Sequence, residues 1–154
     1  MVSLKQEIVQ QLPFSSLEEE ALLNLLRTAD CLQRHFQRST KEWGITGTQY
    51  NVLRILRGAG GPLPCGEIAN RMITRDPDVT RLLDRLEKRG LISRCRETKD
   101  RRTVMTRITP AGLKLLANLD EPVQSAHRRQ LGHLGPKRLR ALAELLHIAR
   151  SRVN

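Results

Sequence analysis

Aromatic residues and cysteines are scarce in this chain, and long apolar runs are missing from it. Aromatic side chains make up only 3% of the 154 residues, so the core must consist mainly of Leu, Ile, Val and Ala, which suits packed helices. Three cysteines, an odd number without paired spacing, argue against a disulfide framework and for a reduced cytosol. No segment approaches the roughly 18 continuous apolar residues of a membrane-spanning helix. Residues 1–13 lack the uninterrupted apolar core of a secretory signal.

Residue patterns typical of catalysis are missing as well. No Ser/His/Asp constellation, phosphate-binding glycine loop or pair of carboxylates occurs at a plausible site. Cys31 and His35 are four residues apart, which is metal-ligand spacing on a helix, but two ligands do not make a site, and core and surface positions explain them. His127, His133 and His147 are scattered without an acidic neighbourhood. We therefore expect no enzyme, no metal site and no cofactor.

Positive charge is what the chain has in excess. The formal net charge is +11 and the pI is about 10.7, which implies a polyanionic partner, either nucleic acid or an acidic membrane surface. The lack of a long apolar segment weakens the membrane alternative. Residues 1–30 contain two bases and five acids, whereas residues 128–154 contain seven bases and one acid. Opposite signs at the two ends suggest that the termini lie near each other, although a solvated surface is the alternative.

The most informative stretch begins at residue 76 with the letters DPDVTRLLDRLEKRG. Asp76 as N-cap and Pro77 at the first helical position are start signals, and Gly90 is a stop signal. Apolar residues at the spacing i, i+3, i+4 and i+7 predict one buried face; they are Val79, Leu82, Leu83 and Leu86. The opposite face is polar and mostly basic, with Thr80, Arg81, Asp84, Arg85 and Lys88. The pattern predicts an amphipathic helix with a basic outer face.

Two short β-type runs follow this helix, at residues 91–96 and 103–108, and the basic segment ETKDRR joins them. Upstream, residues 65–72 form a short helix that meets the basic helix at a turn. Two helices at a turn, followed by a hairpin, are a winged helix-turn-helix. The basic helix suits the major groove of DNA, and the hairpin suits the backbone or the minor groove.

Longer helices are expected on both sides of this unit. Capping boxes at Ser16 and Thr46 open a helix of roughly 25 residues, ending near residue 44, and a second helix that stops at Gly58. The segment TPAG starts a long helix in which Pro122 should produce a kink or a break, and Gly135 precedes the last helix. The first and last helices carry heptad-like apolar stripes. A chain this small has too little core to cover both, so we expect them to pack against each other and against a second copy.

Residues 45–116 resemble the MarR family of bacterial winged-helix transcription regulators. The resemblance rests on VTRLLDRLEKRGLISR, then KDRR, then ITPAG, in this order and spacing. It places the Asp-x-Arg of the family's wing on Asp100 and Arg102, and its T-x-x-G on Thr109 and Gly112, which we expect to act as a helix cap and a close-packing position. The flanking helices match the family only in layout.

The resemblance implies a mostly α fold with a small two- to three-stranded β wing, in which a winged helix-turn-helix is embedded in a helical dimerisation domain. Residues 1–44 and 110–154 would form the dimerisation helices, and residues 45–109 the DNA-binding domain. The expected partners are a second copy of the chain, double-stranded DNA at a pseudo-palindromic operator, and a small-molecule effector. The expected location is the cytoplasm, at the bacterial nucleoid.

The expected function is sequence-specific, DNA-binding transcriptional regulation, by a repressor that a small aromatic or anionic ligand releases. One alternative is an architectural or partner-recruiting DNA binder that senses no ligand. Another is a redox-responsive regulator that uses Cys31, Cys65 or Cys95; oxidant-sensing relatives pair an early cysteine with several tyrosines, and Tyr50 is the only tyrosine here.

The expected site residues form three groups. Those on the recognition helix are Asp76, Asp78, Thr80, Arg81, Arg85 and Lys88. Those on the wing are Lys99, Asp100, Arg101 and Arg102. A ligand pocket between the dimer helices and the winged domain would be lined by Leu32, Phe36 and Tyr50, which core packing explains equally well.

Arginine provides the chemistry that we assign to the recognition helix, because its two-pronged donor suits guanine or phosphate. Thr80 lies near enough to the helix start to reach a phosphate or a thymine methyl group. For Asp76 we favour the role of helix cap over a base contact. Asp78 stands where the family leads us to expect a small hydroxyl residue. It is either a first-turn charge favoured by the helix dipole or an acceptor for the amino group of cytosine.

Overall fold

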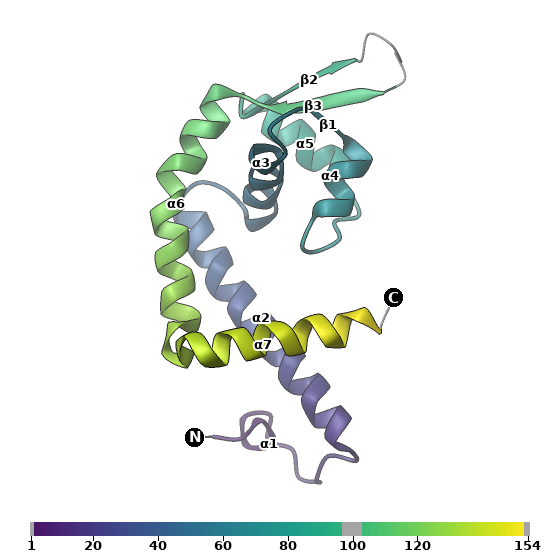
Figure 1. Cartoon of the computed structure of the whole chain (residues 1–154), viewed down its shortest axis with the longest axis vertical. Coiled ribbons are helices and arrows are strands. Elements are labelled where there is room, and N and C mark those ends of the chain that lie inside the picture. The colour runs from purple at the N-terminus through teal and green to yellow at the C-terminus, as the bar shows by residue number, and fades with distance from the viewer. Residues whose placement is uncertain (1, 97–102, 153–154) are drawn as a thin grey trace. The chain divides into compact units, whose positions relative to one another are not determined.

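The computed structural model describes residues 2–96 and 103–152, which are mostly helical with a small antiparallel sheet (Figure 1). The expected fold class, mostly α with a small β wing, is confirmed. The chain divides into two compact units, Met1–Arg38 and Ser39–Asn154. No helix in the described ranges is both long enough and apolar enough to cross a membrane.

The first unit contains α1 (Leu4–Glu7) and most of α2 (Leu17–Glu42). The length of α2, 26 residues, agrees with the expected helix. The predicted capping box at its start is only half formed. The Ser16 hydroxyl accepts from the Glu19 backbone N–H at 3.1 Å, but the Glu19 carboxylate accepts from the backbone N–H of Ser15 at 2.7 Å. The Glu19 carboxylate therefore binds the backbone of Ser15, one residue before the expected partner, Ser16.

In the second unit, α3 (Gly47–Ala59) provides the centre of the core. The predicted capping box is present, because Thr46 Oγ1 accepts from the Gln49 N–H and Gln49 Oε1 accepts from the Thr46 N–H, both at 3.1 Å. The helix does not stop at Gly58 as expected. It continues to Ala59, and Gly60 ends it with φ of +66°. Either glycine can follow a helix, but Gly60 is the one that adopts the left-handed conformation.

The sheet contains β1 (Leu63–Pro64), β2 (Ile92–Arg96) and β3 (Val104–Ile108) in the order β1-β3-β2. The register pairs Ile92 with Ile108 in the hairpin and Leu63 with Thr106 at the other edge. The hairpin was predicted, but β1 was not. Two residues are too few to show an alternating pattern, so only their pairing with β3 reveals the strand.

Two further helices, α4 (Cys65–Arg71) and α5 (Val79–Lys88), complete a three-helix core with α3. The side chains at its centre are at most 2% exposed, and each stabilises the fold by about 1.5–3 kcal/mol; they include Leu53, Leu56, Ile68, Leu83, Leu86 and Ile92. Helix α5 packs against β2, and α3 packs against β3. The outer face of α5 is thereby left exposed.

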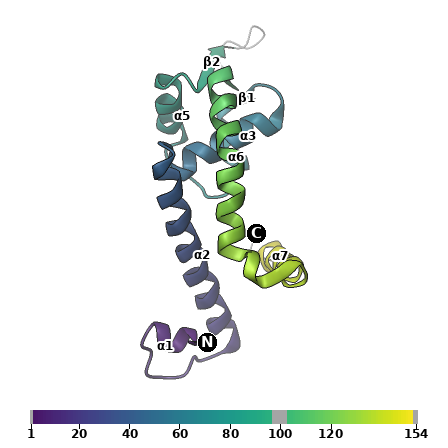
Figure 2. The ribbon, with the colours of Figure 1, turned by 90° about the vertical axis from the view of Figure 1, so that its left-hand side faces the viewer.

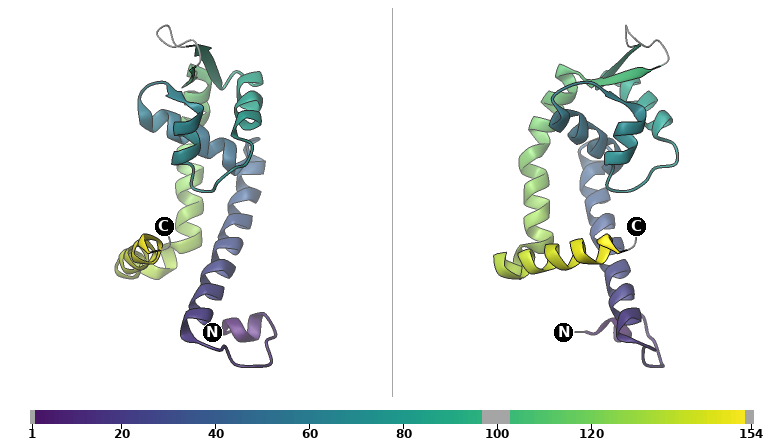
Figure 3. Two further views of the ribbon diagram at one scale, coloured as in Figure 1. Left: turned by 90° about the vertical axis from the view of Figure 1, so that its right-hand side faces the viewer. Right: turned by 45° about the vertical axis from the view of Figure 1, so that its right-hand side comes forward.

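The second unit continues with α6 (Pro110–Leu131), a short 3-10 helix (Gly132–Leu134) and α7 (Gly135–Ser151). Helix α6 runs from the sheet along α3, and α7 begins at its far end (Figures 2 and 3). Pro122 does not break α6. The carbonyl that loses its helical donor belongs to Asn118, an exposed residue where water can replace that donor.

Candidate nucleic-acid interface

The start of α5 differs from the prediction, because Asp78 and not Asp76 is the N-cap. Asp78 Oδ1 accepts from the Arg81 backbone N–H at 3.1 Å, and the helix begins at Val79. Asp76 Oδ1 accepts from the Asp78 N–H at 2.9 Å and so closes a turn one step earlier. Both aspartates have the side chain that a cap requires. Pro77 therefore lies before the cap and not in the first turn.

The rest of α5 follows the predicted pattern. Its apolar face is buried, with Leu82, Leu83 and Leu86 at most 6% exposed. Gly90 ends the helix region with φ of +68°. Among the proposed DNA contacts, Asp76 is half-buried, and the other five are exposed: Asp78, Thr80, Arg81, Arg85 and Lys88.

Sequence reasoning missed Arg94, which joins β2 to α5. Its Nε donates to Glu87 Oε2 at 2.8 Å, and its Nη2 lies 2.6 Å from both Glu87 Oε2 and Asp84 Oδ1. Its backbone N–H donates to Glu87 Oε1 at 3.0 Å. These hydrogen bonds lower the pKa of Glu87 and raise that of the Arg94 guanidinium. Both acids of α5 thus turn toward the sheet.

Charge on α5 is consequently sorted by flank. Asp84 and Glu87 lie three residues apart on the flank that faces β2, where Arg94 neutralises much of their charge. Arg81, Arg85 and Lys88 follow the other flank at four- and three-residue spacing. Within the described residues, Arg85 and Lys88 form no ion pair. The outer surface is therefore cationic although the helix contains acids.

The TPAG corner has the structural roles expected for it. The Thr109 hydroxyl donates to the Gly90 carbonyl at 2.6 Å and accepts from the Gly112 N–H at 3.1 Å, which caps α6. A Cβ atom on Gly112 would lie 2.3 Å from the carbonyl oxygen of Leu91, too close for any side chain. This corner holds the end of α5, β2 and the start of α6 together.

Other predicted site residues lie where the structure does not test them. Lys99, Asp100, Arg101 and Arg102 of the wing are outside the described residues. In the predicted ligand pocket, the half-buried Leu32 and Phe36 belong to the first unit, whereas Tyr50 belongs to the second unit, where burial raises the pKa of its hydroxyl. The pocket remains a prediction.

The cysteines and the possible metal ligands add no assembled site. Cys31 and Cys95 are exposed, and Cys65 is half-buried. No cluster of three or more His, Cys, Asp or Glu residues with metal-binding geometry occurs in the ranges that the structure describes.

Three helices around one core, the third with a cationic outer face, followed by an antiparallel hairpin, define a winged helix-turn-helix. The family model for MarR matches residues 45–104. A crystal structure of a MarR transcription factor from Planctomyces limnophilus is 42% identical, covers 88% of this chain and 99% of its own, and has a TM-score of 0.68. This chain belongs to the MarR family, which consists of transcriptional regulators and not of enzymes.

Two other proteins illustrate the range of the similarity. The HTH-type transcriptional regulator FarR of Neisseria gonorrhoeae is 28% identical over 135 residues, which are 88% of this chain and 92% of FarR. The DNA binding of BpsR from Bordetella bronchiseptica is regulated by 6-hydroxynicotinic acid. Its structure is 23% identical in sequence, has a TM-score of 0.79, and covers 90% of this chain and 98% of its own. At that identity BpsR shows the shared fold alone.

Proposed function

We propose that this regulator is a homodimeric repressor that binds a specific, pseudo-palindromic operator with one α5 helix in each major-groove half-site. The observation that carries the proposal is the sorting of charge on α5. Arg94 draws Asp84 and Glu87 toward β2, so the cations on the other flank meet phosphates and bases with little acidic repulsion. Arg81 and Arg85 have the donor geometry for guanine or phosphate.

A second copy of the chain is needed to present two recognition helices. Helix α7 has no buried residue, and Leu142, Leu145 and Ile148 are 36%, 65% and 51% exposed. An apolar series of this kind on a long helix favours burial against a partner, and regulators of this family act as dimers. We assign residues 1–44 and 110–154 to that interface and residues 45–109 to DNA binding. Half-sites one turn apart, ~34 Å, admit only one spacing of the two α5 helices.

The wing supplies the remaining DNA contacts in this proposal. Arg101 and Arg102 would enter the minor groove, whose negative potential attracts arginine, while Asp100 pairs with an arginine to hold the loop and Lys99 contacts the backbone. Regulation by a small aromatic or anionic effector is supported by BpsR, which binds DNA under the control of an aromatic acid. Leu32, Phe36 and Tyr50 are the proposed lining residues. The effector would act by changing the distance between the recognition helices.

A salt titration of DNA affinity tests the central proposal. The operator is first isolated by selection from random duplexes, and its Kd is then measured between 50 and 200 mM salt. If about six phosphates are neutralised, affinity should fall by about 10³-fold over this range. An affinity that hardly changes would contradict the proposal. An operator complex that ignores every aromatic acid tried would favour the architectural alternative, and one that dissociates only on thiol oxidation would favour the redox alternative.

A further inference from the structure

Asp78 contacts Arg81 twice, at its backbone and at its side chain. Asp78 Oδ1 accepts from the Arg81 backbone N–H at 3.1 Å, and Asp78 Oδ2 lies 3.1 Å from Arg81 Nε. Asp76 holds the Asp78 backbone through a hydrogen bond of 2.9 Å. Both carboxylate oxygens of Asp78 are therefore directed at one residue, and the turn that carries them is itself restrained.

This arrangement uses one edge of the Arg81 guanidinium and leaves the other. Nε is engaged by Asp78, whereas the two terminal nitrogens have no hydrogen-bond partner among the residues that the structure describes. The Arg81 side chain is 77% exposed, so its free end extends into solvent from the first turn of α5. Two terminal N–H groups side by side match the O6 and N7 acceptors of guanine in the major groove.

We propose that Asp78 is a positioning residue that holds Arg81 for recognition of guanine, and that it does not read cytosine itself. The proposal rests on the proposed function, since it requires α5 to enter the major groove. A flexible arginine loses side-chain freedom when it binds a base. The contact with Asp78 removes part of that freedom before DNA arrives. Helix capping alone does not require the second contact, at Nε.

The charges predict a consequence that a purely structural cap would not have. Asp78 and Arg81 together are neutral, so the pair adds little to the attraction for phosphates. Removing the carboxylate should raise affinity for DNA of any sequence and at the same time weaken the preference for guanine. Affinity and specificity are therefore expected to change in opposite directions.

Asp78→Asn is the variant that separates these roles. Asparagine caps a helix about as well as aspartate, so folding should be preserved, which a thermal melt checks. Glu67→Gln is the matched control, because it removes one negative charge from the neighbouring helix α4 but none that contacts Arg81. These two variants are compared with Arg81→Lys and with the double variant Asp78→Asn/Arg81→Lys. Each protein is titrated against the selected operator, against every single-base-pair change in it, and against a random duplex.

The expected result is that Asp78→Asn lowers the preference for guanine at one base pair per half-site by about two- to tenfold, the range set by ordering one flexible side chain. Arg81→Lys should weaken the preference for guanine at the same base pair, and adding Asp78→Asn to it should cause no further loss of that preference. Glu67→Gln should keep the full preference, because Glu67 pairs with Arg71 and not with Arg81.

Three outcomes would overturn the inference. In the first, Asp78→Asn keeps the wild-type preference although Arg81→Lys loses it, which leaves the proposed function intact. In the second, Asp78→Asn changes the preference at a different base pair, or lowers the preference by the same factor when Arg81→Lys is also present. Either result means that Asp78 contacts a base itself. In the third, the wild-type protein prefers no sequence at all, and the proposed function fails as well.

Discussion

Arg57 and Asp120 form a two-point ion pair that ties α3 to α6. Arg57 Nη1 donates to Asp120 Oδ2 and Nη2 to Asp120 Oδ1, both at 2.9 Å. The two residues are 63 positions apart in the chain. The hydrogen bonds lower the pKa of Asp120 and raise that of Arg57. The pair therefore couples the winged-helix core to the helix that leads to α7, and it stabilises the charged form of the carboxylate.

Asp120→Asn should lower the free energy of unfolding at neutral pH by about 0.5–1 kcal/mol, a small value because both side chains are partly exposed. A carboxylate whose pKa is depressed in the folded state stabilises the protein above its ordinary pKa of 3.8, and this contribution disappears as pH falls through the lower folded value. The deficit should therefore be present at pH 7 and shrink below about pH 4. Urea unfolding at both pH values measures it.

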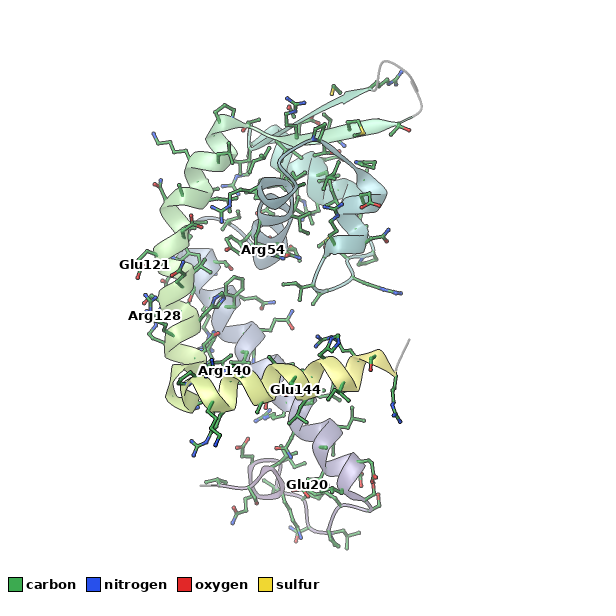
Figure 4. The ribbon with its side chains drawn as sticks, viewed as in Figure 1. Glu20, Arg54, Glu121, Arg128, Arg140 and Glu144 are labelled. Carbon is green, nitrogen blue, oxygen red and sulfur yellow. The ribbon has the colours of Figure 1, made fainter. Side chains whose placement is uncertain are left out.

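Glu121→Gln is the control for this experiment. Glu121 neighbours Asp120 but pairs with Arg128 on the same helix, and both side chains are more than 60% exposed (Figure 4). Its substitution should change stability by less than about 0.5 kcal/mol. A deficit for Asp120→Asn that persists unchanged in acid would show that the ion pair is not its source.

Arg94→Ala should weaken both folding and DNA binding, because Asp84 and Glu87 would then lie uncompensated beside the proposed DNA-binding face of α5. We expect a loss of about 1 kcal/mol in stability, discounted for the partial exposure of both acids, and a rise in the pKa of Glu87 toward its ordinary value of 4.5. DNA affinity should fall because two carboxylates now repel phosphate. Calorimetric unfolding and an operator titration measure the two effects.

A rescue experiment distinguishes charge from packing in the Arg94 variant. Adding Asp84→Asn and Glu87→Gln to Arg94→Ala removes the repulsion between these side chains and phosphate but does not restore the lost ion pairs. DNA affinity should therefore recover more than stability does. Arg96→Ala, at an exposed position on the same strand, serves as the stability control. Failure of the two neutral substitutions to recover any binding would mean that Arg94 acts through geometry alone.

Gly112→Ala should be strongly destabilising, by about 2–3 kcal/mol, because the new methyl group would overlap backbone that has no room to move. Its Cβ would lie 2.3 Å from Leu91 O and 2.8 Å from Ile108 Cγ1. Gly58→Ala is the matched control, since Gly58 lies within α3 and a Cβ there meets nothing within 4 Å. That control should gain about 0.5–1 kcal/mol. If denaturant unfolding gave the two variants the same stability, the close packing at Gly112 would be contradicted.

Thr106→Val should stabilise the fold, by about 1 kcal/mol. The Thr106 side chain is fully buried, and its Oγ1 has no hydrogen-bond partner within the described ranges. Valine has nearly the same shape and removes the polar group whose burial costs free energy. Thr106→Ser keeps the hydroxyl, loses the methyl group and should be destabilising. A shift of the thermal midpoint is the readout, and a lower midpoint for the valine variant would indicate that the hydroxyl is satisfied.

Several features of the site were predictable because a few neighbouring residues determine them. The buried and exposed faces of α5 follow from a spacing of 3.6 residues per turn, and the capping box at Thr46 follows from residues three apart. The roles of Thr109 and Gly112 came with the family resemblance and agree with the structure. Each of these depends on local geometry or on a motif read as a unit.

Local signals failed where two neighbours competed for one role. Asp76 and Asp78 are both suitable caps, and the distinction between them depends on which backbone N–H each side chain reaches. Gly58 and Gly60 are both suitable stops for α3, and Gly60 adopts the positive φ. Pro122 predicts a kink or a break, yet α6 is continuous from Pro110 to Leu131.

By itself, then, the sequence determined most of the helices and the buried face of α5 through short-range periodicity, and the excess of positive charge through composition. The order and spacing of its motifs indicated the family. Only the tertiary structure decided that Arg94 draws the two acids of α5 toward the sheet and that Arg57 meets Asp120 across 63 residues. Long side chains reach several ångströms from the backbone, so their partners depend on how separate elements approach. The spacing of residues along the chain does not indicate how those helices and strands come together.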